Sequence, residues 1–254
     1  MTRSRIAAAA VVLVLAIGVG GYVAYDQVLR GDSIAPLALP TAVPSSDAAS
    51  GSADPARSSG TDASADPASG SGGDIAGTWT VTTGSQAGYR VREQLANLPA
   101  ESDAVGRTDQ VTGSIAVTTD GTTASVTAAT IQVDTTTIAS DKPQRDNRLR
   151  TEGLQTDSYP TATFTLTQPV AIPAAAISGS SSDVTLVGDL TIHGVTKSVS
   201  IPAQAQLMSG TIQVAGSITF PLSDYGMTTP NIGGFIVSIA DQGTLEFVVV
   251  FARS

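Results

Sequence analysis

The chain has 254 residues, no cysteine and one histidine, and its formal net charge at pH 7 is −9. The missing cysteines exclude a disulfide framework, cysteine-ligated zinc, iron–sulfur clusters and a thiol nucleophile, and a single histidine excludes a multi-histidine metal site. The acidic balance argues against nonspecific binding to nucleic acid. Charged residues make up only 14% of the chain, and the abundance of Thr, Ser, Val and Gly disfavours an all-helical fold.

The first 25 residues predict a membrane anchor. Residues 6–25 (IAAAAVVLVLAIGVGGYVAY) carry no charge, and a helix of that length spans roughly 30 Å, the thickness of a hydrocarbon core. Because Arg3 and Arg5 precede the stretch, we expect a single-pass protein of the cell membrane, with residues 1–5 cytoplasmic and the rest extracytoplasmic. A cleaved signal peptide is the alternative, although the apolar stretch is long and lacks a good A-x-A site.

Residues 26–74 predict a disordered linker. From Ser45 to Asp74 every residue except Arg57 is Ala, Ser, Gly, Asp, Pro or Thr. Such a stretch has no large apolar side chain whose burial would offset the entropy cost of ordering. If the linker starts near Ile34, its root-mean-square reach is roughly 35 Å.

Residues 75–254 predict one all-β domain. Hydrophobic and polar residues alternate with period two over 111–118, 184–192, 195–205, 211–220 and 245–251, as in half-buried antiparallel strands. Further strands are expected at 78–82, 87–95, 123–134 and 161–167. Turn signals separate the strands at Asp120-Gly121, His193-Gly194, Ser209-Gly210 and Gln242-Gly243. Eight or nine strands in this regular order predict a closed barrel or a sandwich.

Two segments depart from this alternation. Residues 142–152 predict one short helix, which Ser140 or Asp141 would cap, with Pro143 in the first turn and Gly153 at the end. Residues 222–234 are rich in Gly, Pro and Asn, and we expect them to cross one end of the barrel.

Three ordered blocks resemble the YceI-like family. Residues 145–166 (RDNRLRTEGLQTDSYPTATFTL) resemble its R-D-x-H-L-R … F … Y-P … F block, and residues 187–203 (VGDLTIHGVTKSVSIPA) resemble its G-x-L-T-I-H-G-V-T-K block. Residues 220–227 (FPLSDYGM) resemble its F … R-x-D-F-G-I block, with Ser223 in place of Arg. Arg148 stands where the family has His, and Leu154 where it has a large aromatic residue. The resemblance covers residues 75–254 and is strongest to membrane-anchored, actinobacterial-type members.

This resemblance implies an eight-stranded antiparallel lipocalin-like barrel with an elongated apolar interior. It also implies an exported protein that binds a polyisoprenoid or another long-chain amphiphile, without catalytic residues or a cofactor. Five Phe and one Trp in the whole chain leave interior space for a lipid. The alternative is a barrel packed with Val and Ile that acts as a structural or interaction module of the envelope. The identity of the lipid and the oligomeric state stay open.

The candidate ligand-binding residues share apolar side chains expected at the barrel interior or mouth. They are Trp79, Tyr89, Val91, Ile115, Val117, Leu149, Phe164, Leu190, Ile218, Phe220, Tyr225, Phe235 and Phe247.

Several of the candidates have a structural alternative. Arg145 and Arg148 are the head-group candidates because guanidinium groups suit phosphate, but neighbouring acidic residues could neutralise them instead. Trp79 could plug the core rather than touch a ligand, and Tyr225 could belong to a tight turn. His193 lies at a predicted turn and has no second histidine or cysteine as a partner, so we expect a structural role.

Overall fold

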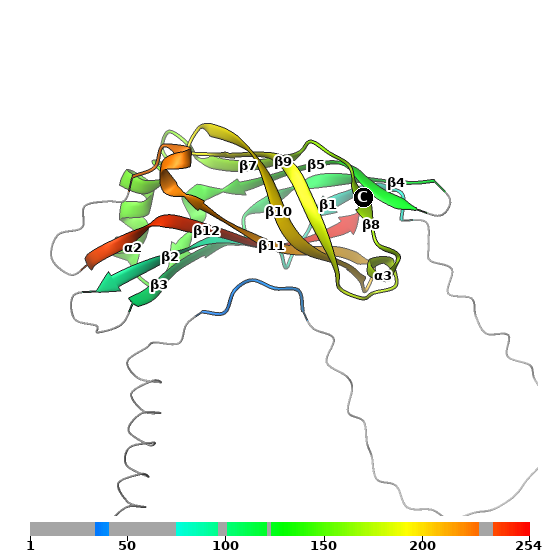
Figure 1. Ribbon diagram of the computed structural model, residues 1–254, viewed down its shortest axis with the longest axis horizontal. Coiled ribbons are helices and arrows are strands. Elements are labelled where there is room, and N and C mark those ends of the chain that lie inside the picture. Colours follow the sequence, from blue (N-terminus) through cyan, green and yellow to red (C-terminus); the bar gives the residue numbers. More distant parts are fainter. Residues whose placement is uncertain (1–33, 41–74, 96–100, 121–122, 229–235) are drawn as a thin grey trace, which may run out of the picture.

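The computed structural model describes residues 34–40, 75–95, 101–120, 123–228 and 236–254 (Figure 1). Its strands are β1 (Gly77–Val81), β2 (Gln86–Leu95), β3 (Glu101–Thr108), β4 (Val111–Thr119), β5 (Ala124–Asp134), β6 (Ala139–Ser140), β7 (Thr161–Leu166), β8 (Val170–Ile172), β9 (Ser182–Ile192), β10 (Val195–Met208), β11 (Thr211–Pro221) and β12 (Ile236–Arg253). The helical segments are η1 (Thr135–Thr137), α2 (Pro143–Arg148), η2 (Leu149–Gly153), α3 (Ala174–Ile177) and η3 (Leu222–Tyr225).

The strands form a closed antiparallel barrel of eight strands, as the resemblance implied, and this decides between the barrel and the sandwich that the alternation left open. The hydrogen-bonded order is β1-β4-β5-β7-β9-β10-β11-β12, and β1 closes the barrel by pairing with β12, where Trp79 lies opposite Arg253. At the other end of the barrel β2 and β3 continue the strands begun by β1 and β4, because β2 pairs with β12 and with β3. Pairing of β1 with β12 thus closes the sheet, whereas β3 is bordered on its outer edge by the short strand β6 at Gly106 and Arg107.

Ser85, the last of the four residues between β1 and β2, bonds the edge of β12. Ser85 Oγ accepts a hydrogen bond from the backbone N–H of Val250 at 2.9 Å and donates one to the carbonyl of Thr82 at 2.8 Å. The side chain thus replaces a ladder contact where the strand bends, and Ser85 is buried.

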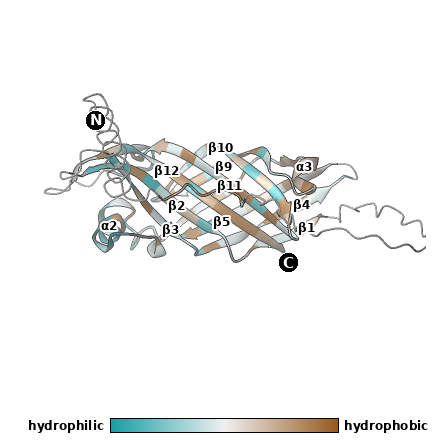
Figure 2. Ribbon diagram, turned by 90° about the horizontal axis from the view of Figure 1, so that it is seen from below, coloured by the Kyte–Doolittle hydropathy of each residue, from teal (hydrophilic) through white to brown (hydrophobic). Residues whose placement is uncertain are grey.

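The inward faces follow the sequence pattern. On β4, Val111, Ile115 and Val117 are buried, and on β9 the same is true of Leu190 and Ile192. Figure 2 shows hydrophobic and hydrophilic residues alternating along the strands of the elongated barrel. The predicted strands at 78–82, 87–95, 123–134 and 161–167 are confirmed within one residue at either end.

The turn predictions have mixed outcomes. His193 (φ 50°) with Gly194 (φ 71°), and Ser209 with Gly210, are two-residue hairpin loops with positive φ at both positions, as predicted. The pair Gln242-Gly243 is no turn: it lies inside β12, beside a register shift between Ile239 and Gly243. Glycine here marks a β-bulge that bends the longest strand. Gly121 lies outside the described residues.

The predicted helix is shorter than expected and differently capped. α2 ends at Arg148, and a single π-helical turn, η2, continues the chain to Gly153. The N-cap is Lys142, whose side chain makes no capping bond. Ser140 and Asp141, the expected caps, make other contacts: Ser140 binds Asp146 at 2.6 Å, and Asp141 pairs with Arg145. The short helix α3 has no counterpart among the predicted elements.

Aromatic rings of the interior lie against glycines on neighbouring strands. A Cβ atom built on Gly188 would stand 2.5 Å from the Phe164 ring, and one on Gly216 would stand 2.9 Å from the Phe247 ring. The Tyr89 ring covers Gly106 in the same way. The missing Cβ atoms therefore give three large rings room against the barrel wall.

Residues 34–40 lie against the outside of the barrel in an extended conformation, although the composition assigned them to the linker. Arg90 donates to the carbonyl of Ile34 at 2.7 Å, and Gln206 donates to that of Pro40 at 3.5 Å. Across the described ranges, no helix has the length and hydrophobicity needed to cross a membrane. The anchor predicted at residues 6–25 and the remainder of the linker lie outside those ranges.

Candidate functional site: an apolar cavity with a polar mouth

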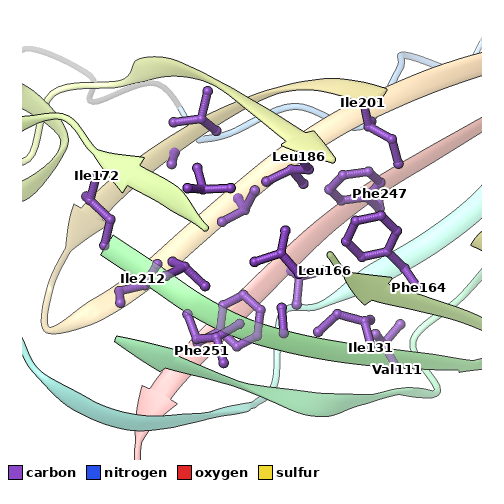
Figure 3. A pocket seen from close by; sticks show the side chains of 18 of the residues that line it. Val111, Ile131, Phe164, Leu166, Ile172, Leu186, Ile201, Ile212, Phe247 and Phe251 are labelled. Carbon is purple, nitrogen blue, oxygen red and sulfur yellow. The ribbon is translucent and has the colours of Figure 1, made fainter. Parts of the chain in front are cut away.

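The barrel encloses an apolar chamber at its α3 end. Its volume is about 140 Å³, and its lining residues are almost all aliphatic or aromatic. Figure 3 shows Phe164 and Phe247 projecting into this space from β7 and β12, with Leu186 and Ile201 beside them. The walls present no charged group, so this chamber suits a hydrocarbon and does not suit an ion.

A second, wider chamber lies at the α2 end. Its volume is about 790 Å³, within the range of small-molecule sites. Four residues line both chambers: Ala87, Val133, Ala162 and Leu245. The two spaces therefore adjoin along the barrel axis, the inner one apolar and the outer one bearing polar groups at the mouth.

A buried ion pair organises the polar mouth. Glu93 is 4% exposed and accepts a hydrogen bond from Arg145 Nη2 at 2.5 Å. Arg145 Nη1 also contacts Asp141 at 2.5 Å. Burial by itself would lower the pKa of Arg145, but the Glu93 and Asp141 carboxylates raise it above its ordinary value. Burial would raise the pKa of Asp141, yet the hydrogen bond and charge of Arg145, with Lys142, hold it below its ordinary value.

The helix α2 is tied to this mouth through Asp146. This buried carboxylate accepts hydrogen bonds from the backbone N–H of Ser140 at 3.0 Å and from its hydroxyl at 2.6 Å. These hydrogen bonds join the two ends of the segment 140–146 into a compact loop. It holds Arg145 against Glu93, so the local fold fixes the position of the cation at the rim.

Tyr89 supplies an uncharged donor inside the outer chamber. Its hydroxyl is buried and has no hydrogen-bond partner within the described part of the chain. Burial, partly opposed by the charge of Arg145, raises the pKa of Tyr89 to about 12. The side chain is thus a neutral O–H group at physiological pH, free to bond an oxygen of a ligand.

The structure places ten of the predicted site residues on the cavity wall. In the inner chamber these are Ile115, Phe164, Leu190 and Phe247, and in the outer chamber they are Tyr89, Val91, Leu149, Phe220, Arg145 and Arg148. Arg145 engages Glu93 and Asp141, the local neutralisation considered from the sequence, whereas Arg148 is exposed at the rim.

Four predicted residues do not line either chamber. Trp79 is buried in the core at the α3 end, where its indole N–H donates to the carbonyl of Ile75 at 2.9 Å. Val117 packs in the same core, and Ile218 is half-buried on β11. Tyr225 is 1% exposed and packs edge-on against Phe220, beside the turn at Gly226. Phe235 lies outside the described residues.

Two alanines, one buried carboxylate and two apolar residues of irregular segments line the chambers but were not predicted. The alanines at 87 and 162 carry no pattern beyond alternation that marks them as the junction between the chambers. Glu93 follows Arg90 and Arg92 on a strand rich in charged residues, so its sequence does not mark it as buried, and Arg145 of α2 reaches it across the barrel end. Ile138 and Met227 also line the outer chamber and come from irregular segments.

His193 has the structural place expected of it. Its Nδ1 atom lies 3.1 Å from the carbonyl oxygen of Tyr225, and its ring packs against Tyr159 with centroids 4.5 Å apart. No group of three His, Asp or Glu side chains suited to a metal ion occurs in the residues the structure covers. The histidine thus joins the β9–β10 turn to η3, which is a structural role.

The fold and sequence both match known proteins. The model of the YceI-like domain matches residues 79–251. Protein YceI of Escherichia coli O17:K52:H18 (strain UMN026 / ExPEC) is 35% identical over 75 residues, which are 29% of this chain and 35% of that protein. The match thus spans about a third of the length of this curated relative.

One solved structure supports the same fold, and a second is similar over part of this chain. A polyisoprenoid binding domain from Saccharophagus degradans, implicated in plant cell wall breakdown, superposes with a TM-score of 0.54 at 19% identity. The superposition covers 70% of this chain and 99% of that domain. BcnA of Burkholderia cenocepacia gives a TM-score of 0.49 at 20% identity over 65% of this chain and 95% of the other. With its domain model matched over most of the barrel, the chain belongs to the YceI-like family.

Proposed function

We propose that the protein is a membrane-tethered, extracytoplasmic lipid-binding module. It holds a polyisoprenoid or a similar long-chain amphiphile with its chain along the barrel axis and its polar end at the α2 mouth. The observation that carries this function is the pair of adjoining chambers: an apolar chamber of about 140 Å³ lies next to a chamber of about 790 Å³ with a polar rim. The similar domain from Saccharophagus degradans, described as polyisoprenoid binding, supports the choice of ligand class.

The chemistry of the walls fits an amphiphile. Each buried CH₂ contributes about 0.8 kcal/mol, so a long chain binds without polar help in the inner half. At the mouth the Tyr89 hydroxyl offers one neutral donor, and Arg148 offers an exposed cation. The described lining of both chambers is mostly apolar, which supports binding as the function proposed.

Membrane tethering rests on the sequence of residues 1–25. The uncharged stretch after Arg3 and Arg5 supports a single span with the barrel outside. A tethered carrier would collect its ligand from the same membrane that anchors it.

Native mass spectrometry of the full chain, purified in detergent from a native-like host and followed by organic extraction, tests the lipid. A discrete added mass that extracts as a prenyl or other long-chain lipid supports the carrier. A ligand-free mass, with no rise in Tm when prenyl lipids are added, favours instead a packed barrel that acts as an envelope interaction module. The inner chamber, narrower than a typical ligand site, is the observation that keeps this second function in view.

A further inference from the structure

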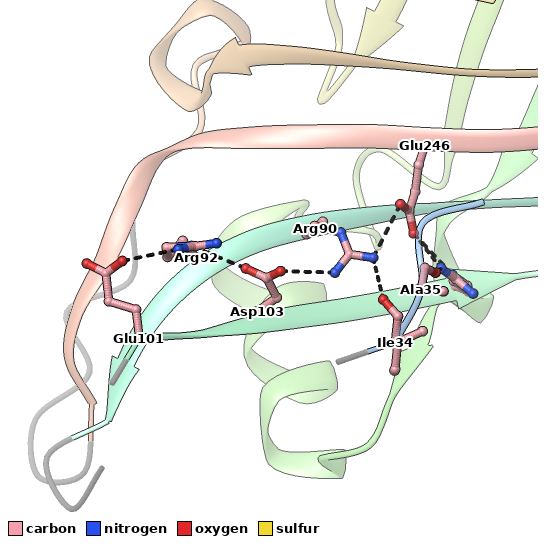
Figure 4. Close-up of polar contacts among 8 residues, drawn as sticks. Ile34, Ala35, Arg90, Arg92, Glu101, Asp103 and Glu246 are labelled. Atoms are coloured by element: carbon pink, nitrogen blue, oxygen red, sulfur yellow. Dashed lines mark hydrogen bonds and ion pairs between the residues drawn. The ribbon is translucent and has the colours of Figure 1, made fainter. Parts of the chain in front are cut away.

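Residues 34–40 (IAPLALP) cross the outer face of the barrel like a strap, and that name is used for them below. Arg90 on β2 and Arg107 on β3 donate to the carbonyls of Ile34 and Ala35 (Figure 4). At the other end, Gln206 on β10 donates to the carbonyl of Pro40. Because β12 and β11 lie between β2 and β10 in the sheet, the strap passes over both of these strands.

The barrel surface under the strap is built to receive it. Glu246 points outward from β12 yet is only 1% exposed, and it pairs with Arg107 at 2.8 Å and with Arg90 at 3.5 Å. This carboxylate holds both guanidinium groups in place, so they meet the strap carbonyls already oriented. Val248 on β12 and Ala215 on β11 occupy outward positions but are 9% and 6% exposed.

The strap itself has an alternating pattern that fits this surface. Leu37 and Leu39 are half-buried, whereas Pro36 and Ala38 are exposed. Alternate side chains therefore face the sheet, as they do in any extended segment. Pro36 and Pro40 restrict the backbone before docking, which reduces the entropy lost on docking. The seven residues thus combine apolar contacts with hydrogen bonds at both ends.

Ile34, the first residue of the strap, and Ile75, the first residue of the barrel domain, lie toward opposite ends of the barrel. Ile34 is held by Arg90, and β2 runs on from Arg90 to Glu93 at the mouth. Ile75, in contrast, packs in the core cluster with Ile172 and Ile177 at the α3 end. Figure 1 shows the strap beneath the barrel and α2 and α3 at opposite ends.

We propose that the strap determines which end of the barrel faces the membrane. This inference rests on the membrane tethering proposed above. With the strap docked, eight residues (26–33) connect it to the anchor and span at most about 29 Å. They join the strap at Ile34, its end nearer the mouth, so the lipid-binding end is held toward the bilayer.

Release of the strap changes both reach and orientation. The tether then comprises 49 residues (26–74), with a root-mean-square reach of roughly 35–42 Å. It joins the barrel at Ile75, the end away from the mouth. Docking thus replaces a long tether at the α3 end of the barrel with a short tether beside the mouth.

Spin labels on the full chain in detergent test the docking first. Because the protein has no cysteine, Ala38→Cys with Ser217→Cys, both at exposed positions, gives two unique sites. A docked strap gives a narrow distance distribution. A segment held only through residues 41–74 gives a broad one, because residue 38 is then separated from Ile75 by a random-coil distance of roughly 30–36 Å. We expect the narrow distribution, its loss in Leu37→Ser/Leu39→Ser, and its retention in the control Ala35→Ser. A broad distribution in the unaltered strap overturns the proposal.

Energy transfer to a labelled lipid in liposomes then tests the orientation. Donors are placed singly at Gln144→Cys on α2 or at Ser180→Cys beyond α3, both exposed. We expect stronger transfer from position 144, and loss of this difference in Leu37→Ser/Leu39→Ser. Equal transfer from both positions, in protein that floats with the liposomes, overturns the orientation alone. Protein that does not float overturns the tethering as well, and lipid binding, tested by mass spectrometry, stands or falls separately.

Discussion

The guanidinium group of Arg145 lies 2.5 Å from the carboxylate of Glu93, and this pair joins α2 to the barrel strand β2 across the mouth of the cavity. Glu93 is almost wholly buried, and among the described residues Arg145 is the cation that pairs with it. Through this pair the helix α2 contacts the lining of the outer chamber.

Removing the cation should therefore cost stability. We expect Arg145→Ala to lower the free energy of unfolding by about 3–5 kcal/mol, because it leaves Glu93 buried and unpaired. Urea denaturation measures this loss. Arg148→Ala, at an exposed position one turn along the same helix, should change stability by less than about 0.5 kcal/mol. The double variant Arg145→Ala/Glu93→Gln should recover much of the loss, and a double variant as unstable as Arg145→Ala would contradict this account.

The buried hydroxyl of Tyr89 makes stability depend on alkaline pH. The pKa of Tyr89 is about 12 in the folded state against 10.0 for an ordinary tyrosine. Between these values the unfolded chain loses the proton and the folded chain keeps it. Its contribution, up to about 2–3 kcal/mol, is thus complete below pH 10 and is lost as the pH rises to 12.

Tyr89→Phe should be free of this loss. We expect its free energy of unfolding to fall less than that of the parent protein between pH 9.5 and pH 11.5, measured by denaturant titration at each pH. The raised pKa of Tyr225 affects both proteins alike and cancels in the comparison. If the free energy of unfolding fell equally with pH in the two proteins, the Tyr89 hydroxyl would be better solvated than its surroundings indicate.

Most of the barrel could be predicted because its strands and tight turns are specified by residues that are close in the sequence. Alternation marks every strand whose two faces differ in polarity, such as β4 and β9, and the pairs His193-Gly194 and Ser209-Gly210 specify tight hairpins by their left-handed backbone. The strand β3 was missed because its sequence, ESDAVGRT, is polar at one end. Its charged residues are accommodated by pairing with β2, where Arg92 meets Asp103 at 3.3 Å.

The remaining features depend on contacts between distant segments. Gln242-Gly243 has the composition of a turn, and only pairing with β2 and β11 keeps it inside a strand. Ala87 and Ala162 come from strands 75 positions apart, and their meeting at the junction of the chambers follows from barrel closure. The strap was assigned to the linker because IAPLALP, taken alone, has no partner. Its contacts exist only once Arg90, Arg107 and Gln206 have been brought to one face.

Gly188 should not tolerate a side chain. A Cβ atom there would lie 2.4 Å from the carbonyl oxygen of Thr165 and 2.5 Å from the Phe164 ring. We expect Gly188→Ala to destabilise the protein by about 1–3 kcal/mol through overpacking. Gly153→Ala, whose Cβ would meet only the end of the flexible Leu149 side chain at 3.3 Å, is the matched control. Thermal unfolding compares the two, and equal Tm values would mean that β7 and β9 separate easily.

Ala162 lies where the two chambers meet, and a large side chain there should block the passage between them. We expect Ala162→Phe to exclude the end of a long lipid from the inner chamber, because the methyl group it replaces lines both spaces. Titration with prenyl lipids of increasing length measures this. Affinity for the longest should fall at least tenfold, while that for the shortest changes little, since these fit the outer chamber.

The matched control places the same ring on the outside of the barrel. Ala128 is exposed on β5, so Ala128→Phe should leave affinities for all chain lengths unchanged. Ala162 also packs beside the Leu190 cluster, so Phe at position 162 should lower Tm modestly by overpacking while the protein stays folded. Unchanged binding of the longest lipid by a folded Ala162→Phe protein would show that the chain does not pass the junction, and would confine the ligand to the outer chamber.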